Sequence, residues 1–267
     1  MTMSLIKFEQ VSFKRSDRYI LKDISLTIEP GVITAIMGAS GSGKSTLLNL
    51  MVGRLTADNG RITLLDQELN SRIGSGIYQL WRRMGFLFQS AALFNDLTVL
   101  ENVMFPIDEH TTLPEIMQEI VAIMKLEAVG LRAAASYYPH QLSGGMQRRV
   151  ALARAIALDP EIVFYDEPFA GQDPISMGVL VRLIKQFNQD LGITSILVSH
   201  DVGETLAIAD KVIFLHEGKI RFDGTAHDFV RCQDPGVVQF VQALADGPVK
   251  FNMPSAHTIG EQLICLK

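Results

Sequence analysis

The chain has 267 residues, of which 48% are hydrophobic, and its formal net charge is −5 at pH 7. This length fits one large domain, or one domain with a subdomain, and the apolar content is sufficient for a buried core. The acidic balance argues against a nucleic-acid partner, because a protein that binds a phosphate backbone needs clustered positive charge.

The sequence also lacks the usual marks of a membrane-spanning or secreted protein. It has no run of about 18 apolar residues, which a membrane-spanning helix needs. Residues 1–7 lack a basic stretch followed by an apolar run, so we expect no secretory signal. Cys232 and Cys265 are too few for a disulfide framework. We therefore expect a soluble, cytosolic α/β protein.

The first ninety residues predict strands around one helix. Alternating stretches at 5–13 and 20–28 predict antiparallel strands at the edge of a sheet. The apolar run 32–37 predicts a strand buried on both faces. Residues 45–55 predict a helix with an apolar face, and 84–88 predict another short strand.

From residue 90 onward the pattern becomes helical. Segments such as 113–125 predict a mostly helical subdomain, spanning about 90–160, that is inserted into the sheet. Its last helix is predicted at 144–158, with Ser143 as the N-cap.

Strands and helices then alternate, as a parallel α/β core requires. Strand 162–165, helix 176–191 and strand 193–199 follow in order, and 211–216 with 219–222 predict a terminal hairpin. We place the main domain at 1–225. Residues 226–267 are weakly patterned and form a C-terminal extension, of which 246–267 is predicted to be a tail.

A glycine-rich stretch between the strand at 32–37 and the helix at 45–55 matches the phosphate-loop pattern GxxxxGK[ST]. Its glycines let successive amides turn around an anion, and the helix start adds positive potential. Lys44 can reach the β- and γ-phosphates, the Ser45 hydroxyl can bind Mg²⁺, and Thr46 is a further candidate nucleotide ligand. The loop residues are Gly38, Ala39, Ser40, Gly41, Ser42, Gly43, Lys44 and Ser45.

Two carboxylates, Asp166 and Glu167, end the strand predicted at 162–165. In a nucleotide site such a strand delivers Asp166 to the magnesium shell, whereas Glu167 can act on the attacking water. A strand that ends in an acidic residue at the surface is equally common without function, so the phosphate loop decides in favour of the functional interpretation.

The stretch Leu142-Ser143-Gly144-Gly145 identifies the class of phosphate-loop protein. It resembles the LSGGQ signature of the ABC transporter ATPases, with Met146 in place of the usual glutamine. The resemblance implies an α/β P-loop NTPase fold: a RecA-like mixed sheet core, an antiparallel β edge subdomain and an inserted helical subdomain. It also implies that Ser143, Gly144 and Gly145 bind the γ-phosphate held by a second copy of the chain, again by anion binding at a helix start.

Other family positions are matched in order. Gln89 corresponds to the glutamine that reaches Mg²⁺ and the attacking water, and His200 to the histidine that contacts the γ-phosphate. Asp173 lies where the family's D-loop contacts the partner, although Gln172 departs from the usual form. The adenine-stacking aromatic is replaced by Arg15, whose guanidinium can stack on a base. Tyr19 and Phe13 are alternatives to Arg15.

Further stretches are similar to the ATPase subunits of the Mla phospholipid transporters. These are 88–94, 109–114, 169–174 and 246–249. The resemblance implies an ATP- and Mg²⁺-dependent ATPase, a homodimer, peripheral on the cytoplasmic face of the inner membrane. It implies a role in outer-membrane lipid asymmetry. The implied partners are a multispanning permease, a small STAS-domain protein and a periplasmic lipid-binding subunit.

Three other functions remain as alternatives. The chain could be an ABC ATPase of DNA maintenance or translation, an ABC importer or exporter ATPase for another substrate, or a nucleotide-binding regulator without catalysis. Segment 53–141 is too short for the long coiled coils of DNA-repair members and has no sustained heptads. Translation factors of this class carry two cassettes, whereas this sequence has one. Glu167 argues against a regulator without catalysis.

Overall fold

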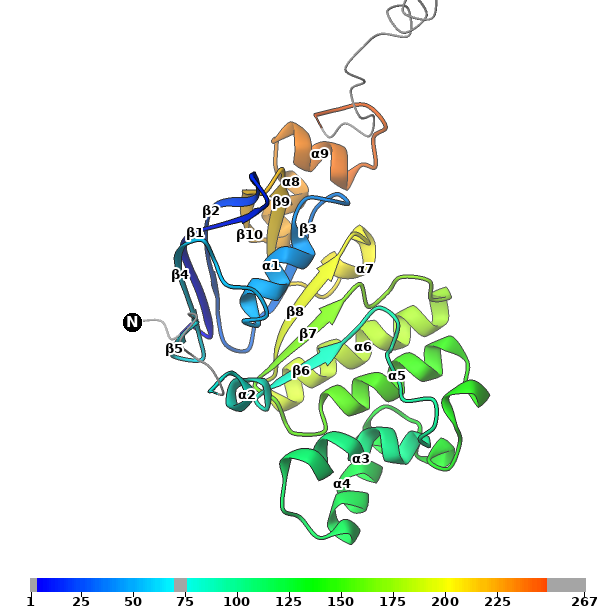
Figure 1. The fold of residues 1–267 in the computed structure, drawn as a ribbon. Coiled ribbons are helices and arrows are strands. Elements are labelled where there is room, and N and C mark those ends of the chain that lie inside the picture. Colours follow the sequence, from blue (N-terminus) through cyan, green and yellow to red (C-terminus); the bar gives the residue numbers. More distant parts are fainter. Residues whose placement is uncertain (1–3, 70–75, 249–267) are drawn as a thin grey trace, which may run out of the picture.

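The computed structural model describes residues 4–69 and 76–248, which form two sheets flanked by helices (Figure 1). The core sheet contains these strands: β3 (Ile33–Met37), β6 (Met84–Leu87), β7 (Ile162–Asp166), β8 (Thr194–Ser199), β9 (Lys211–His216) and β10 (Lys219–Thr225). Their order across the sheet is β10-β9-β3-β8-β7-β6. Strand β10 is antiparallel to β9, and the remaining neighbours are parallel. The predicted terminal hairpin and parallel core are therefore confirmed.

A separate antiparallel sheet lies beside the core sheet (Figure 1). Its strands are β1 (Ile6–Arg15), β2 (Arg18–Ile28), β4 (Asn59–Leu64) and β5 (Gln67–Glu68), in the order β2-β1-β4-β5. The predicted antiparallel pairing of the first two strands is confirmed. Strand β4 was not predicted, because its first half is exposed and polar and only Ile62 and Leu64 are buried.

Helices occupy both faces of the core sheet. They are α1 (Lys44–Met51), α2 (Gly76–Trp81), α3 (Val99–His110), α4 (Glu115–Ala128), α5 (Gly144–Ala155), α6 (Pro174–Leu191), α7 (Val202–Leu206), α8 (Ala226–Arg231) and α9 (Pro235–Val241), with 3₁₀ turns at Arg132–Ala134 and Pro139–Gln141. The three helices α3, α4 and α5 are inserted between β6 and β7, as predicted. None of the helices in the described ranges combines the length and apolarity needed to span a bilayer.

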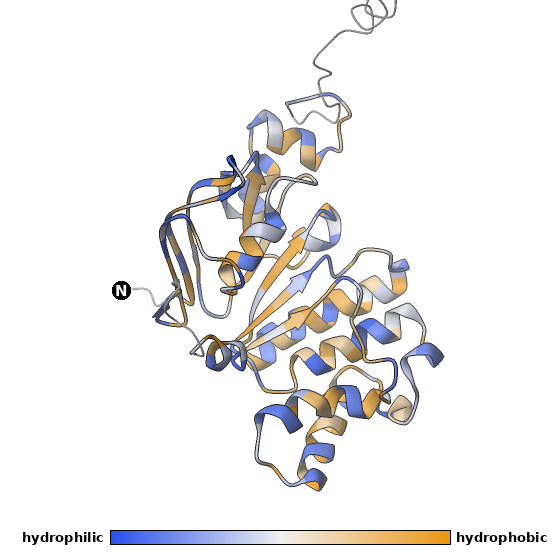
Figure 2. Ribbon diagram, viewed as in Figure 1, coloured by the Kyte–Doolittle hydropathy of each residue, from blue (hydrophilic) through white to orange (hydrophobic). Residues whose placement is uncertain are grey.

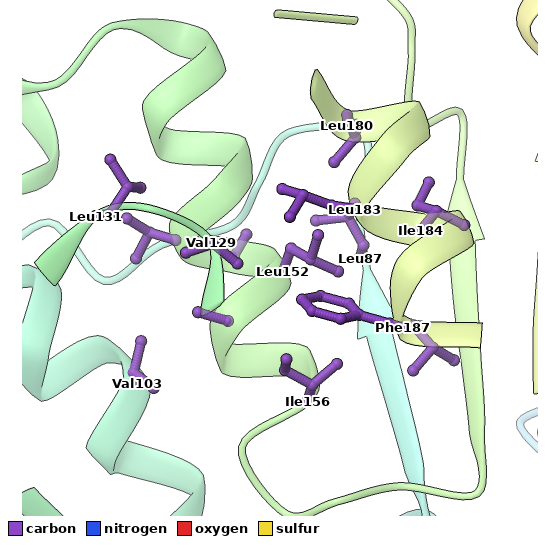
Figure 3. Packing of buried hydrophobic residues seen from close by; sticks show 14 of the residues in the cluster. Leu87, Val103, Val129, Leu131, Leu152, Ile156, Leu180, Leu183, Ile184 and Phe187 are labelled. Carbon is purple, nitrogen blue, oxygen red and sulfur yellow. The ribbon is translucent and has the colours of Figure 1, made fainter. Parts of the chain in front are cut away.

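Strand β7 shows how the core is divided. Ile162 and Phe164 face the cluster around α1, whereas Val163 and Tyr165 face the cluster built with α5 and α6. Alternate side chains of a strand point to opposite faces, so a strand between two helical layers is apolar throughout. Figure 2 shows β6 and β8 coloured largely as hydrophobic, whereas the helices are hydrophobic along only part of their surface. Figure 3 shows side chains of α5 and α6, among them Leu152 and Phe187, packed in one cluster with Leu87 of β6.

Two predictions about helices are corrected. The helix predicted at 45–55 ends at Met51, because Gly53 adopts a left-handed φ of 71° and the chain turns there. Residues 226–241, expected to be weakly patterned, contain α8 and α9. Helices of six and seven residues are too short to give a readable period. Residues 249–267 of the predicted tail lie outside the described part of the chain.

Candidate nucleotide site

The phosphate loop joins β3 to α1, as the pattern predicts. Gly38 has a φ of 151°, and a Cβ there would lie 2.2 Å from the main-chain oxygen of Leu215, so no larger residue fits. The Lys44 ammonium donates to the main-chain oxygens of Gly38 at 2.8 Å and Ala39 at 3.2 Å. These bonds fold the lysine back along its own loop, and Lys44 lines the cavity into which the loop opens.

The loop opens into a cavity of about 830 Å³. The loop residues that line the cavity are Ala39, Ser40, Gly41, Gly43, Lys44, Ser45 and Thr46. Gln89, Asp166, Glu167 and His200 line it from other segments. These residues come from four parts of the sequence, and all of them are sequence-predicted site residues. Gly38 and Ser42 do not line the cavity. Ser42 is buried, and Gly38 packs against β9, so both stabilise the loop from its inner side.

Charges inside the cavity compensate one another in part. Burial lowers the pKa of Lys44, and the neighbouring carboxylates of Glu167 and Asp166 oppose that shift. Burial also raises the pKa of Asp166, as does the negative charge of Glu167, while Lys44 acts in the other direction. One ammonium and two carboxylates thus share a partly desolvated space, an arrangement suited to a bound anion with a divalent cation.

Glu167 and His200 form the closest pair of ionisable side chains in the cavity. The Oε2 atom of Glu167 lies 2.8 Å from Nδ1 of His200 and also accepts from the His200 main-chain amide at 3.3 Å. Glu167 has a left-handed φ of 47°, and its amide donates to the Val198 oxygen at 2.8 Å. A left-handed non-glycine residue is a strained conformation that is often found at functional sites. Here it occurs at the residue directly after Asp166, and both side chains line the cavity.

Asp201 was missed by the sequence analysis. Ligand atoms of Asp201, Glu167 and His200 all lie within 4.8 Å of one another. The Oδ2 atom of Asp201 is buried and has no hydrogen-bond partner. Its position directly after His200 could have identified Asp201 as a candidate site residue in the sequence.

The signature residues lie at the start of α5. The Ser143 hydroxyl accepts from the Met146 amide at 3.3 Å, so the predicted N-cap is confirmed. Ser143 and Gly144 are exposed, whereas a Cβ at Gly145 would lie 2.4 Å from the Ser176 hydroxyl. None of these three residues lines the cavity of its own chain.

Two further predicted site residues also lie outside this cavity. Asp173 caps α6, accepting from the amides of Ile175 and Ser176 at 3.0 Å; hydrogen bonding to Ser176 lowers its pKa. Arg15 pairs with Arg18 at the end of the β1–β2 hairpin, and it is Ile20 that reaches the cavity from β2. The Tyr19 ring is covered by Lys14, whose Nζ lies 4.5 Å from the ring centroid.

The C-terminal segment supplies the remaining cavity wall, which the sequence analysis did not predict. The residues concerned are Gln239, Phe240, Ala243, Leu244 and Ala245. They come from the end of α9 and the turn after it.

Comparison with known proteins agrees with this geometry. The family model described as ABC transporter matches residues 21–170. The chain is 49% identical over 261 residues to the intermembrane phospholipid transport system ATP-binding protein MlaF of Haemophilus influenzae, covering 98% of this chain and 99% of the relative. It is 50% identical over 252 residues to the protein of that name from Escherichia coli K12, covering 94% of each chain.

Solved structures of ATP-binding cassettes have the same fold. The dimeric, post-hydrolysis cassette MJ0796 bound to ADP and Pi aligns with a TM-score of 0.74 at 30% identity, covering 83% of this chain and 98% of that one. The cbiO1 protein of Clostridium perfringens, part of an ABC transporter complex, aligns with a TM-score of 0.80 at 30% identity, covering 91% and 96%.

Proposed function

Because the chain belongs to the ABC transporter family and hydrolyses ATP, we propose that it is the motor subunit of a phospholipid transporter. It works as a homodimer in which each ATP lies between two copies. The position of the signature residues supports the proposed dimer. Ser143 and Gly144 are exposed and lie outside the cavity that holds the phosphate loop. A second copy can therefore bring its α5 N-terminus to that cavity as an anion-binding group.

The charges of the cavity explain why bound ATP closes the dimer. Lys44 and the loop amides neutralise only part of the charge on three phosphates, so the helix start of the partner completes the anion site. Hydrolysis and phosphate release remove that link, and the dimer opens. Asp173, exposed at the start of α6, is the proposed D-loop contact between the copies.

Glu167 is the proposed base. Its carboxylate is held by His200 at 2.8 Å and lines the same cavity as Lys44 and Gln89. Glu167 orients or deprotonates water for in-line attack on the γ-phosphate, while His200 and Gln89 position that water. His200 also contacts the γ-phosphate.

The oxygen atoms in this cavity fit a magnesium ion. Ser45, Gln89 and Asp166 all line it, and hydroxyl, amide and carboxylate oxygens are the donors that Mg²⁺ prefers. When bound, Mg²⁺ neutralises phosphate charge. Removing it with a chelator is expected to stop hydrolysis, measured as phosphate release, and calcium should not restore the rate.

A complementation experiment tests the shared site. Lys44→Ala disables the phosphate loop, and Ser143→Arg blocks the signature with a bulky side chain; each variant alone is expected to be inactive. Mixed, they form a heterodimer with one intact composite site, made from the loop of the S143R copy and the signature of the K44A copy. Recovery of phosphate release on mixing supports the proposal. No recovery, despite heterodimers detected by differential tags, contradicts it.

The segment after Gln89 is the proposed contact with the membrane permease. Phe94 and Phe105 are 43% and 41% exposed, and their ring centroids lie 4.7 Å apart. Asn102 is fully buried and fixes the segment, accepting from the Phe94 amide at 2.8 Å and donating to three main-chain oxygens between Phe94 and Thr98. An exposed aromatic pair on a rigid support is suited to receive an apolar element. By contrast, Leu93 packs on the core.

We place the protein on the cytoplasmic face of the inner membrane, with the permease, a small STAS-domain protein and a periplasmic lipid-binding subunit in the same complex. The near-full-length identity to the Mla relatives supports this assembly. Copurification from detergent-solubilised membranes tests it: a multispanning protein should accompany the tagged chain, and the double substitution Phe94→Ser, Phe105→Ser should release it without loss of ATP binding.

The phospholipid cargo needs its own test, since this subunit does not touch the cargo. The purified complex, reconstituted in vesicles with a labelled phospholipid, is expected to transfer label only with ATP. Retrieval of a permease for another substrate would favour an importer or exporter of a different kind. Retrieval of no membrane protein would favour an ABC ATPase of DNA maintenance or translation.

A further inference from the structure

The nucleotide cavity has two chemically different ends. The phosphate loop provides the charged end, with Lys44 and the two carboxylates. At the other end lie the side chains of Phe240, Ala243, Leu244 and Ala245 from the C-terminal segment, with Ile20 from β2. Those five side chains carry no polar atom, and the polar side chain of Gln239, which also lines the cavity, donates to the Leu244 oxygen. A ligand that fills both ends must be ionic at one end and apolar at the other.

The wall formed by residues 239–245, called here the α9 wall, is held by one main-chain and one side-chain hydrogen bond. The Leu244 amide donates to the Gln239 oxygen at 3.0 Å, and the Gln239 side-chain amide donates to the Leu244 oxygen at 3.3 Å. Between them Ala243 has a left-handed φ of 52°. This conformation is costly for a residue with a Cβ, and it ends α9 so that Leu244 turns back to the cavity.

The α9 wall and the phosphate loop rest on the same strands. The Phe240 ring packs on Phe214 of β9, with centroids 5.1 Å apart, and Phe214 is fully buried. Phe214 is in register with Met37, the last residue of β3 before the phosphate loop. Figure 1 shows α9 at the end of the core sheet where β3 leads into α1. The spacing between wall and loop is therefore set by two adjacent strands of the core.

We propose that the α9 wall binds the purine base of the nucleotide. With the phosphates on the loop, the base extends into the apolar end and lies between Ile20 and Leu244, with Phe240 behind. This assigns to the C-terminal segment the contact that Arg15 and Tyr19 do not make in this cavity. The base contributes its apolar faces, and burying a face against aliphatic and aromatic carbon is favourable.

The chemistry of the wall also predicts its selectivity. Adenine and guanine differ at their polar edges and present similar faces. Because Ile20, Phe240 and Leu244 have no polar side-chain atom, and the side-chain amide of Gln239 donates to the Leu244 oxygen, the wall is expected to strengthen the binding of both purines alike.

Binding of three ligands to Leu244→Ala tests the proposal. The ligands are ADP, GDP and pyrophosphate, each with Mg²⁺ and measured by isothermal titration. Diphosphates are used because they retain the base without a γ-phosphate to close the dimer. Loss of part of one leucine contact is expected to weaken the binding of ADP and GDP about fivefold. The affinity for pyrophosphate should be unchanged. Leu244→Met, which keeps the apolar volume, should bind as the parent does.

The matched control is Leu191→Ala. Leu191 is 54% exposed, compared with 45% for Leu244, and ends α6 away from the cavity lining. Thermal unfolding of all variants shows whether each one folds. The proposal is overturned if L244A binds ADP as tightly as L191A does. It is also overturned if L244A weakens the binding of pyrophosphate as much as that of ADP, because the lost contact would then not be to the base.

Discussion

Arg148 donates a hydrogen bond from Nη1 to the main-chain oxygen of Glu167 at 2.9 Å. The same guanidinium reaches the oxygens of Pro168, Gln89 and Ala170 at 2.6, 2.5 and 3.2 Å. One buried side chain of α5 therefore joins the helix that begins at the signature to both cavity segments that carry Gln89 and Glu167. Burial lowers the pKa of Arg148, but a guanidinium stays charged in proteins.

Replacing Arg148 by lysine should separate positioning from folding. An ammonium has three donors on a flexible stem and does not span four carbonyls. We expect kcat for ATP to fall about tenfold, with little change in KM, if Gln89 and Glu167 lose their relative placement. Arg149→Lys is the control, since Arg149 donates to the single oxygen of Val129. Equal kcat values in the two variants would rule out a special role for Arg148.

Replacing Glu167 by glutamine keeps the shape of the side chain and removes its basicity. Nucleotide binding should persist, and phosphate release should fall by a factor of about 10² to 10⁴. Because ATP then remains between the copies, size-exclusion chromatography with ATP should show a stable dimer. A hydrolysis rate equal to that of the parent would contradict the assignment of the base.

Replacing His200 by alanine removes the partner that holds the Glu167 carboxylate at 2.8 Å. We expect the rate of ATP hydrolysis to fall by a factor of about 10², whereas the affinity for ADP should be retained. Groups that act as a unit are not additive, so the double variant H200A/E167Q should be no slower than E167Q alone. Multiplied losses in that double variant would mean that the two residues act independently.

The lowered pKa of Lys44 gives a pH dependence of nucleotide affinity. The protonated amine binds phosphate, and burial favours the neutral amine in the free protein. Affinity for ADP should therefore fall as the pH rises, beginning below the ordinary lysine pKa of about 10.4. Binding should be accompanied by proton uptake, measured by titration in buffers of different ionisation enthalpy. In Lys44→Arg the cation does not titrate in this range, so its affinity, although lower, should not change with pH.

Truncation after Pro248 tests whether the C-terminal extension contacts the partner subunit. The cut leaves the α9 wall complete, including Gly247, which packs on Gln239. ADP affinity should therefore be unchanged, while dimerisation with ATP in the E167Q background should weaken. Sedimentation at several concentrations measures this. The resemblance to the Mla ATPases implies that the extension, residues 226–267, contacts the partner subunit, and unchanged assembly of the shortened chain would contradict that proposal.

Much of the site could be predicted from the sequence because its chemistry lies in contiguous motifs. Residues 38–45 fold around an anion through local glycine conformations and a helix start, which need no distant partner. Asp166 ends, and Glu167 follows, a strand that is recognisable because it is apolar on both faces. Ser143 caps α5 by a bond within one turn. In each case the determining interaction is local.

Only the tertiary structure decided what distant segments contribute to the cavity. The register of β3 with β9 places Phe214, and through it Phe240 and Leu244, beside the phosphate loop. Likewise, Arg148 binds carbonyl groups 19 to 59 residues away in the sequence. A short helix with no readable period and an arginine within a helix carry no local signal of these roles. Their partners are fixed by sheet pairing and core packing, which join residues that no sequence pattern relates.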